Sequence, residues 1–298
     1  MDRSIMSSKI RISALLLLVA GIGYGCSADR VTYEGKDHIM FSDESYDLGV
    51  LDAEEWFEIP ISAMRSCDHD RNIGVEVLAS RSNAIEGLHY TIEQNTLRIP
   101  AGKLTTELRI KANPDNIALT DSLGIALRLV IDEEYKWDEY GIEAEVHLHK
   151  CCPMDMNLFT GYCKLTSTWI MQYMNTDARL VRTERDPNDE NTIIVRDMFY
   201  DGYDVRLRFD GRERLNPIMN FDEHVIGSTG EAFGTIYGNG KLMMAEPTGY
   251  TSYYGTCERF AVQYATIYVE EVGTVGTYVN IFEWISDDEA ERIMREGF

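Results

Sequence analysis

The sequence predicts an all-β protein: an antiparallel β-sandwich, then an antiparallel meander or barrel-like domain with a short C-terminal helix. Short apolar or alternating segments recur along the chain, separated by Gly, Pro and Asn turn signals. No helical periodicity competes with these segments in residues 38–150. The 298 residues, 44% of them hydrophobic and 26% charged, fit a globular protein with two domains of roughly 100 to 200 residues each.

The charge balance excludes one class of partner. The chain carries 28 Lys and Arg residues against 50 Asp and Glu residues, a formal net charge of -22. Proteins that bind phosphate backbones need the opposite balance, because their affinity comes from basic side chains that displace counterions. We therefore expect no nucleic-acid partner.

The first 25 residues are predicted to be a signal peptide. Arg3, Lys9 and Arg11 precede an apolar run over residues 12–22, which is shorter than the roughly 20 residues of a membrane span. Gly25 and Cys26 resemble the lipobox of bacterial lipoproteins, which implies an acylated Cys26, a tether over residues 26–37 and a membrane partner through the lipid. The alternative is an ordinary secretory signal that contains a cysteine.

Residues 38–150 are predicted to form the sandwich. Branched or alternating apolar residues mark six short strands, and Asn95, Gly102 and Gly141 mark turns between them. The expected strands are 54–61, 73–80, 96–99, 104–112, 123–131 and 144–150.

This first domain resembles the Calx-beta repeat. The resemblance rests on Asn83 to Tyr90, on the hairpin from Leu97 to Lys103 and on the strand from Glu107 to Ala112, and it covers residues 38–131. It implies a sandwich whose acidic loops hold calcium at one end. Here His89 replaces the usual Asp, and Asn113-Pro114-Asp115 stands where an acidic pair is usual.

Calcium is a cofactor that the sequence leaves open. It takes six to eight oxygen ligands, several of them carboxylates. The candidate ligands are Asp115, Asp132, Glu133 and Glu134. The alternative is that these are solvated loop acids on an acidic protein.

Residues 151–159 break the strand pattern and are predicted to be a linker, followed by a β domain over residues 160–298. Val205, Leu207 and Phe209 alternate with polar residues, which indicates a strand with one buried face. Ser286 and Glu289 form a capping-box pattern that predicts the terminal helix, docked through Ile293 and Met294. The expected strands are 164–173, 178–183, 192–195, 205–209, 234–237, 242–245, 259–270 and 276–285.

The whole arrangement resembles Bacteroidetes cell-envelope lipoproteins that join a Calx-beta-like domain to a C-terminal β domain of unknown function. The resemblance rests on this architecture and on spaced Gly and aromatic positions such as Asp201-Gly202-Tyr203. It implies an outer-membrane lipoprotein, at the cell surface or on the periplasmic face, that binds ligands such as glycans. The resemblance implies no catalytic residues in this sequence.

Five cysteines follow Cys26, so at least one thiol stays unpaired within a monomer. Export permits disulfides. We expect Cys163 to pair with Cys257, and Cys67 to pair with Cys151 or Cys152. The alternative is that all five are buried free thiols.

A second metal interpretation concerns zinc. His147, His149 and Cys151 are two residues apart along one strand, which places them on one face, and imidazole and thiolate are zinc ligands. Simple alternation of polar and apolar residues explains the same pattern.

Motifs for catalysis are missing from the sequence. It contains no G-x-S-x-G elbow, phosphate loop, dinucleotide fingerprint or H-E-x-x-H helix. His224 and Ser228 are neighbours along the chain and do not resemble a triad. Glycosidases need two carboxylates set across a sugar, and no pair stands out among the fifty acids. We predict that the protein is not an enzyme.

Aromatic residues give the best candidates for ligand binding. Tyr250, Tyr253 and Tyr254 lie in a turn-rich segment, and Trp137 lies in a similar segment of the first domain. Exposed rings stack on sugars or on a partner protein at low cost in side-chain entropy. The alternatives are that the tyrosines plug one end of the barrel and that Trp137 joins the two domains.

The resulting prediction is a lipid-anchored envelope protein that recognises carbohydrate or a peptide or protein ligand. The alternative is a structural, adhesion or scaffold component that docks on an envelope protein. A hydrolase or an accessory protein to one is the third hypothesis.

Overall fold

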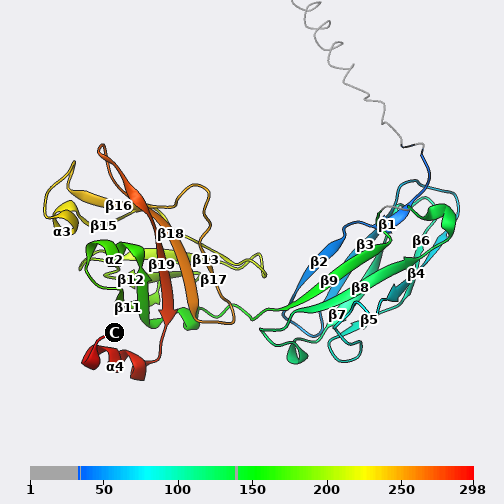
Figure 1. The fold of residues 1–298 in the computed structure, drawn as a ribbon, viewed down its shortest axis with the longest axis horizontal. Helices are drawn as coiled ribbons and strands as arrows, with labels where there is room; N and C mark the ends of the chain where they lie inside the picture. The colour runs from blue at the N-terminus through cyan, green and yellow to red at the C-terminus, as the bar shows by residue number, and fades with distance from the viewer. Residues whose placement is uncertain (1–32, 34, 138–139) are drawn as a thin grey trace, which may run out of the picture.

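The computed structural model describes residues 33, 35–137 and 140–298 and shows an all-β protein with two hydrophobic cores (Figure 1). The expected fold class is thereby confirmed. Cys26 and the signal segment lie outside the described residues. Within those residues, no helix combines the length and apolar character that crossing a membrane requires.

The first part is a sandwich of two sheets. Alternate residues of each strand point into the core, as Leu108, Ile110 and Ala112 do. All strand pairs are antiparallel except β2 with β9. One sheet has the order β1 (Ile39–Phe41), β3 (Trp56–Ala63), β7 (Thr105–Ala112), β5 (Tyr90–Ile92), and the other β2 (Ser45–Val50), β9 (Glu143–Lys150), β8 (Leu123–Val130), β4 (Arg71–Val77), β6 (Thr96–Ile99).

Three short 3-10 helices lie in the connections. They are η1 (Pro114–Asn116), η2 (Glu133–Tyr135) and η3 (Met156–Phe159). The six predicted sandwich strands correspond to β3, β4, β6, β7, β8 and β9. The short strands β1, β2 and β5 were not predicted.

The second part is a sheet that closes on itself. Following the pairings β18–β17–β14–β13–β12–β11–β10–β19 leads back to β18, which forms an eight-stranded barrel. Closure leaves no exposed edge on these strands. The strands are β10 (Gly161–Ser167), β11 (Ala178–Arg185), β12 (Thr192–Arg196), β13 (Val205–Asp210), β14 (Ile218–Asn220), β17 (Tyr253–Tyr254), β18 (Phe260–Val269) and β19 (Gly273–Trp284). The hairpin of β15 (His224–Ser228) and β16 (Lys241–Ala245) extends the sheet from β18.

Helices α2 (Thr168–Tyr173), α3 (Thr229–Phe233) and α4 (Asp287–Glu296) complete this part. One expected strand is too long and another is wrong. The predicted strand 164–173 ends at Ser167, whose hydroxyl accepts from the amides of Trp169 and Ile170 and starts α2. The predicted strand 234–237 is wrong because Gly234, with φ of 70°, terminates α3.

The predicted terminal helix is confirmed as α4, with Ser286 as its N-cap. Ile293 is buried on it. Met294 is 57% exposed, so its expected docking is wrong.

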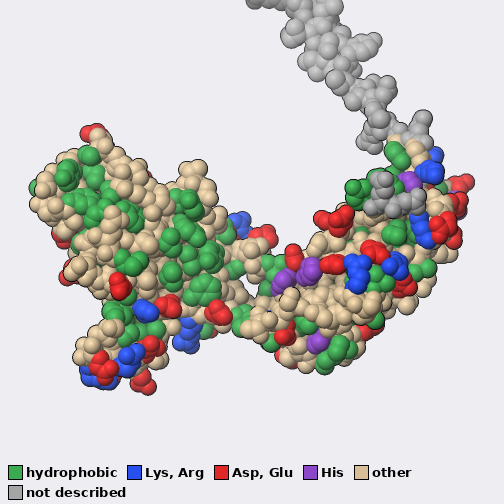
Figure 2. All heavy atoms as spheres, in the orientation of Figure 1, with side chains coloured by type: hydrophobic (Ala, Val, Ile, Leu, Met, Phe, Trp, Pro, Cys, Tyr) green, Lys and Arg blue, Asp and Glu red, His purple; other side chains and the backbone are tan. Residues whose placement is uncertain are grey.

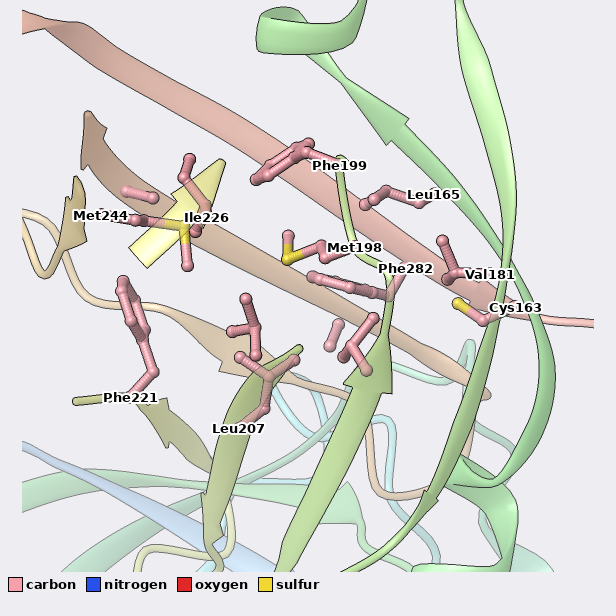
Figure 3. Packing of buried hydrophobic residues seen from close by; sticks show 14 of the residues in the cluster. Cys163, Leu165, Val181, Met198, Phe199, Leu207, Phe221, Ile226, Met244 and Phe282 are labelled. Atoms are coloured by element: carbon pink, nitrogen blue, oxygen red, sulfur yellow. The ribbon is translucent and has the colours of Figure 1, made fainter. Parts of the chain in front are cut away.

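The barrel interior is filled with side chains, as Figure 3 shows. Phe199, Phe282 and Leu165 are fully buried there. Trp169 projects from α2 into the same core and packs against Tyr173, with ring centroids 4.2 Å apart. Each fully buried large apolar side chain contributes about 1.5–3 kcal/mol, so this core stabilises the barrel strongly.

The expected disulfide pairing is wrong. Cys152 pairs with Cys257, with Cα atoms 5.0 Å apart, while Cys67, Cys151 and Cys163 are free. Cys163 faces the barrel core beside Val181 (Figure 3), whereas Cys257 lies in the loop between β17 and β18. Burial raises the pKa of the Cys163 thiol. The alternative of five free thiols is wrong as well.

Candidate ligand-binding surface

An aromatic and apolar surface covers part of the outside of the barrel. The odd-numbered residues of β18, from Ala261 to Val269, point into the barrel. Val262, Tyr264 and Tyr268 therefore point outward. We call one continuous part of this exterior the tyrosine face. It consists of Tyr250, Tyr253, Phe260, Val262, Tyr264, Val279 and Ile281.

Strand register brings these residues together. Tyr253 of β17 pairs with Val262 of β18, and Val262 pairs with Ile281 of β19. On the other side Tyr253 pairs with Ile218 of β14. Since neighbouring strands are 4.7–4.9 Å apart, this row of four residues is about 15 Å wide. Figure 2 shows hydrophobic side chains gathered over this region of the barrel.

Two tyrosines are strongly exposed on this face. Tyr250 is 60% exposed, and its ring lies 5.3 Å from that of Tyr264 at an interplanar angle of 30°. Tyr253 is 42% exposed and meets the ring of Phe260 edge-on, with centroids 6.4 Å apart. Buried Ser252 accepts a hydrogen bond from the amide of Tyr264 at 3.0 Å, which holds the loop against β18.

Tyr254 does not belong to this surface, which corrects the expectation for it. Successive residues of a strand point to opposite sides, so Tyr254 points inward where Tyr253 points outward. It is 2% exposed and packs on Phe159 and Phe209, with centroid distances of 5.6 and 4.7 Å. Burial raises the pKa of the Tyr254 phenol to about 12. This residue therefore plugs the barrel, as the alternative interpretation held.

Trp137 lies in the sandwich and is half-buried. Its ring stacks on His38 at 5.6 Å and meets Tyr140 edge-on at 5.4 Å. It precedes β9, while the chain leaves for the barrel after the last residue of β9, Lys150. Trp137 therefore lies at the end of the sandwich away from the barrel and does not join the two parts.

The zinc candidates share one face of the sandwich without forming a site. The rings of His147 and His149 are 6.4 Å apart, and the His149 Nε2 atom lies 2.9 Å from the Asp47 carboxylate. The Cys151 thiol is buried and donates instead to the carbonyl of Arg214 at 3.7 Å. In the described part of the chain, no three His, Cys, Asp or Glu residues cluster as metal ligands.

The calcium candidates are separated by the length of a strand. Asp115 lies in η1, in the connection that leads into β8, whereas Asp132, Glu133 and Glu134 follow the end of β8. The eight residues of β8 place these acids at opposite ends of the sandwich. The four acids therefore do not form the common calcium site that the sequence left open.

His224 and Ser228 have structural roles. The His224 Nε2 atom accepts a hydrogen bond from the backbone amide of Arg206 at 2.9 Å. Ser228 is the N-cap of α3 and forms a capping box with Glu231. Neither side chain activates the other.

Two carboxylates on the barrel exterior are bound to an arginine and to backbone amides. Arg212 binds Asp210 through two nitrogens, which lowers the carboxyl pKa of Asp210. The amide of Asn191 lowers the carboxyl pKa of Asp189 in the same way. These groups are held ionised, whereas a general acid needs a raised pKa.

A comparison with known protein families identifies the family to which the barrel belongs. The family described as domain of unknown function DUF4984 matches residues 139–296. The chain belongs to the DUF4984 family. The DUF4984 region contains the whole barrel and the tyrosine face. No curated protein sequence matches the chain.

Several solved structures are similar to the chain. The apo-form Calx CBD1 domain is 17% identical, covers 39% of this chain and 98% of its own, and gives a TM-score of 0.33. A Bacteroides ovatus protein of unknown function is 10% identical over 82% of this chain and 89% of its own, with a TM-score of 0.35. An auxiliary nutrient binding protein from Bacteroides thetaiotaomicron is 13% identical over 87% of this chain and 93% of its own, with a TM-score of 0.32.

The sequence drew attention to Tyr250 and Tyr253 and missed their partners. Phe260, Val262 and Tyr264 alternate along one strand, and alternation alone does not tell whether such a face points into the barrel or outward. The half-exposed Ile281, in the neighbouring strand, carries the same alternation.

Proposed function

We propose that this protein is a lipid-anchored binding protein of the bacterial cell envelope that recognises carbohydrate through the tyrosine face and catalyses no reaction. The observation that carries the proposal is the exposure of the Tyr250 and Tyr253 rings on the outside of the barrel, where Tyr250 packs on Tyr264 and Tyr253 packs on Phe260 of the same strand. Sugars present apolar C–H faces that pack on aromatic rings, and rings fixed by Tyr264 and Phe260 lose little entropy on binding.

The test is carbohydrate binding by the double variant Tyr250→Ala/Tyr253→Ala. A panel of soluble polysaccharides (glycogen, β-glucan, xylan, galactomannan, pectin and mucin) is run against the protein in affinity gel electrophoresis. We expect wild type to be retarded by at least one polysaccharide and the variant to lose that retardation. Tyr237→Ala is the matched control, because Tyr237 is 47% exposed but lies in the loop between α3 and β16.

Three outcomes would contradict parts of the proposal. Unchanged retardation of the double variant would remove the tyrosine face from carbohydrate binding. Absence of retardation with every polysaccharide, together with recovery of an envelope protein by wild type and not by the double variant, would favour the scaffold function. Release of reducing sugar from a bound polysaccharide would contradict the absence of catalysis.

The lipid anchor is a separate part of the proposal, because Cys26 lies outside the described residues. Cells fed an alkyne fatty acid should label wild type but not Cys26→Ala, and the wild type should fractionate with the outer membrane. An unlabelled wild type would contradict the anchor without bearing on the tyrosine face.

A further inference from the structure

A cleft of about 470 Å³ lies between the sandwich and the barrel. Lys150 and His149, at the end of β9, line it on the sandwich side. Asn216, Glu258 and Phe260 line it on the barrel side. Both parts of the molecule are therefore needed to form the cleft.

The walls of this cleft are fixed relative to each other. The Cys152–Cys257 disulfide attaches the chain to the barrel two residues after β9 ends, so Cys151 alone lies between the last strand residue and the bridge. The Arg214 guanidinium binds the Glu55 carboxylate across the junction at 2.5 Å. The cleft is thus formed before any ligand arrives, which reduces the entropy cost of binding.

The cleft holds polar groups with unused hydrogen-bonding capacity. Among the described residues, the side chains of Lys150, Asn216 and Glu258 have neither an ion pair nor a hydrogen bond. Together they offer an ammonium donor, an amide that both donates and accepts, and a carboxylate acceptor. This combination matches sugar hydroxyl groups, each of which donates and accepts.

Phe260 connects the cleft to the tyrosine face. Its ring meets Tyr253 edge-on and also lines the cleft. The same ring lies against the backbone of Gly255, where an added Cβ atom would be 2.6 Å from its nearest carbon. A ligand that stacks on Tyr253 and extends past Phe260 therefore enters the cleft.

We propose that the cleft is a second subsite for the same ligand, so that the protein binds an extended carbohydrate chain and not a single sugar or disaccharide. This inference rests on the proposed function of the tyrosine face. The chain stacks on Tyr250 and Tyr253, passes Phe260, and hydrogen-bonds with Lys150, Asn216 and Glu258.

The experiment measures how substitutions in the cleft and at control positions change the binding of short and long ligands. The polysaccharide that retards wild type is partially hydrolysed, and its disaccharide and long-oligosaccharide fractions are titrated by calorimetry. The cleft variant is Lys150→Ala/Asn216→Ala. The matched control is Lys103→Ala/Asn95→Ala, which removes the same groups from exposed positions of the sandwich.

We expect wild type to bind the long fraction more tightly than the disaccharide. The cleft variant should lose about tenfold on the long fraction, equivalent to about 1.4 kcal/mol, and nothing on the disaccharide. The control should match wild type on both fractions.

The cleft subsite and the function of the tyrosine face are contradicted by different results. If the cleft variant binds the long fraction as wild type does, while Tyr250→Ala/Tyr253→Ala loses both fractions, the cleft subsite is overturned and the tyrosine face stands. If the tyrosine variant binds both fractions normally, the proposed function fails. A wild type that binds no polysaccharide of the panel overturns both. Circular dichroism confirms that each variant is folded.

Discussion

Trp284 donates a hydrogen bond from its indole Nε1 atom to the hydroxyl of Thr183, 2.8 Å away, inside the barrel. The two residues come from β19 and β11, which flank β10. Thr183 in turn donates to the carbonyl of Phe159 at 2.9 Å. One buried hydroxyl therefore links the last strand of the barrel to the segment that enters it.

Replacing Thr183 by Val should destabilise the protein by about 1–3 kcal/mol, because the buried indole N–H and the carbonyl would both lose their partner. Urea unfolding followed by tryptophan fluorescence measures the change. Thr183→Ser keeps the hydroxyl and should cost less. Because valine keeps the methyl group, a Thr183→Val variant as stable as wild type would show that these hydrogen bonds do not stabilise the barrel.

The adjacent tyrosines of β17 should differ sharply in their effect on stability. Tyr254→Ala removes a ring from the core and should cost about 3–5 kcal/mol, whereas Tyr253→Ala removes a half-exposed ring and should cost about 0.5 kcal/mol or less. Thermal unfolding of the two variants tests this. Similar midpoints would contradict the assignment of inward and outward faces.

Loss of the Cys152–Cys257 disulfide should lower stability and loosen the junction. The bridge spans a sequence separation of 105 residues, and removing a disulfide typically costs about 2–4 kcal/mol. Small-angle scattering of Cys152→Ser/Cys257→Ser should show a larger radius of gyration than wild type. Cys67→Ser, which removes a free thiol, should change neither quantity. An unchanged radius would mean that the Glu55–Arg214 contact holds the junction alone.

Alkaline pH should destabilise the barrel through Tyr254. Its pKa is raised by burial from 10.0 to about 12, so the folded state keeps the phenol protonated after the unfolded chain has released its proton. The stability that this contributes is complete below about pH 10 and is lost as the pH rises towards 12. Unfolding free energies measured over this range should fall less steeply in Tyr254→Phe. Parallel curves would contradict the shift.

At acid pH, protonation of Asp210 should reduce the stability of the protein. Its pKa is lowered by hydrogen bonds from Arg212, so its stabilising effect is present above its ordinary pKa near 3.8 and is lost as the pH falls through the lower folded value. Carboxyl chemical shifts in an NMR titration should give a pKa below 3.8 for wild type. Arg212→Ala should raise it towards the ordinary range, since only the backbone amide of residue 212 then still donates to the carboxylate, and an unchanged value would assign the shift to another group.

The sequence predicted the elements whose pattern is local. The alternation of Val205, Leu207 and Phe209 is confirmed as β13, and the helix predicted after Ser286 is confirmed as α4. A second capping box, from Ser228 to Glu231, was present but not recognised, and it would have identified α3. Two-residue strands such as β17 give no pattern of their own, so the opposite orientations of Tyr253 and Tyr254 could not be predicted.

What could not be predicted depends on contacts distant in sequence. The partner of Cys257 is 105 residues away, and only the fold shows that Cys163 faces the core. In the same way, Asp115 and Asp132 are close in sequence but lie at opposite ends of β8. Composition and periodicity indicate which residues are buried, whereas topology decides which of them meet.

The position of Trp137 and His38 determines the distance between the start of the described chain and the barrel. These residues mark the end of the sandwich at which the described chain begins, and the eight residues of β9 lead from there to the junction with the barrel (Figure 1). At about 3.3 Å per residue, β9 spans about 26 Å. If the chain is held at its start, as proposed, the sandwich separates the DUF4984 barrel from the point of attachment by about this distance.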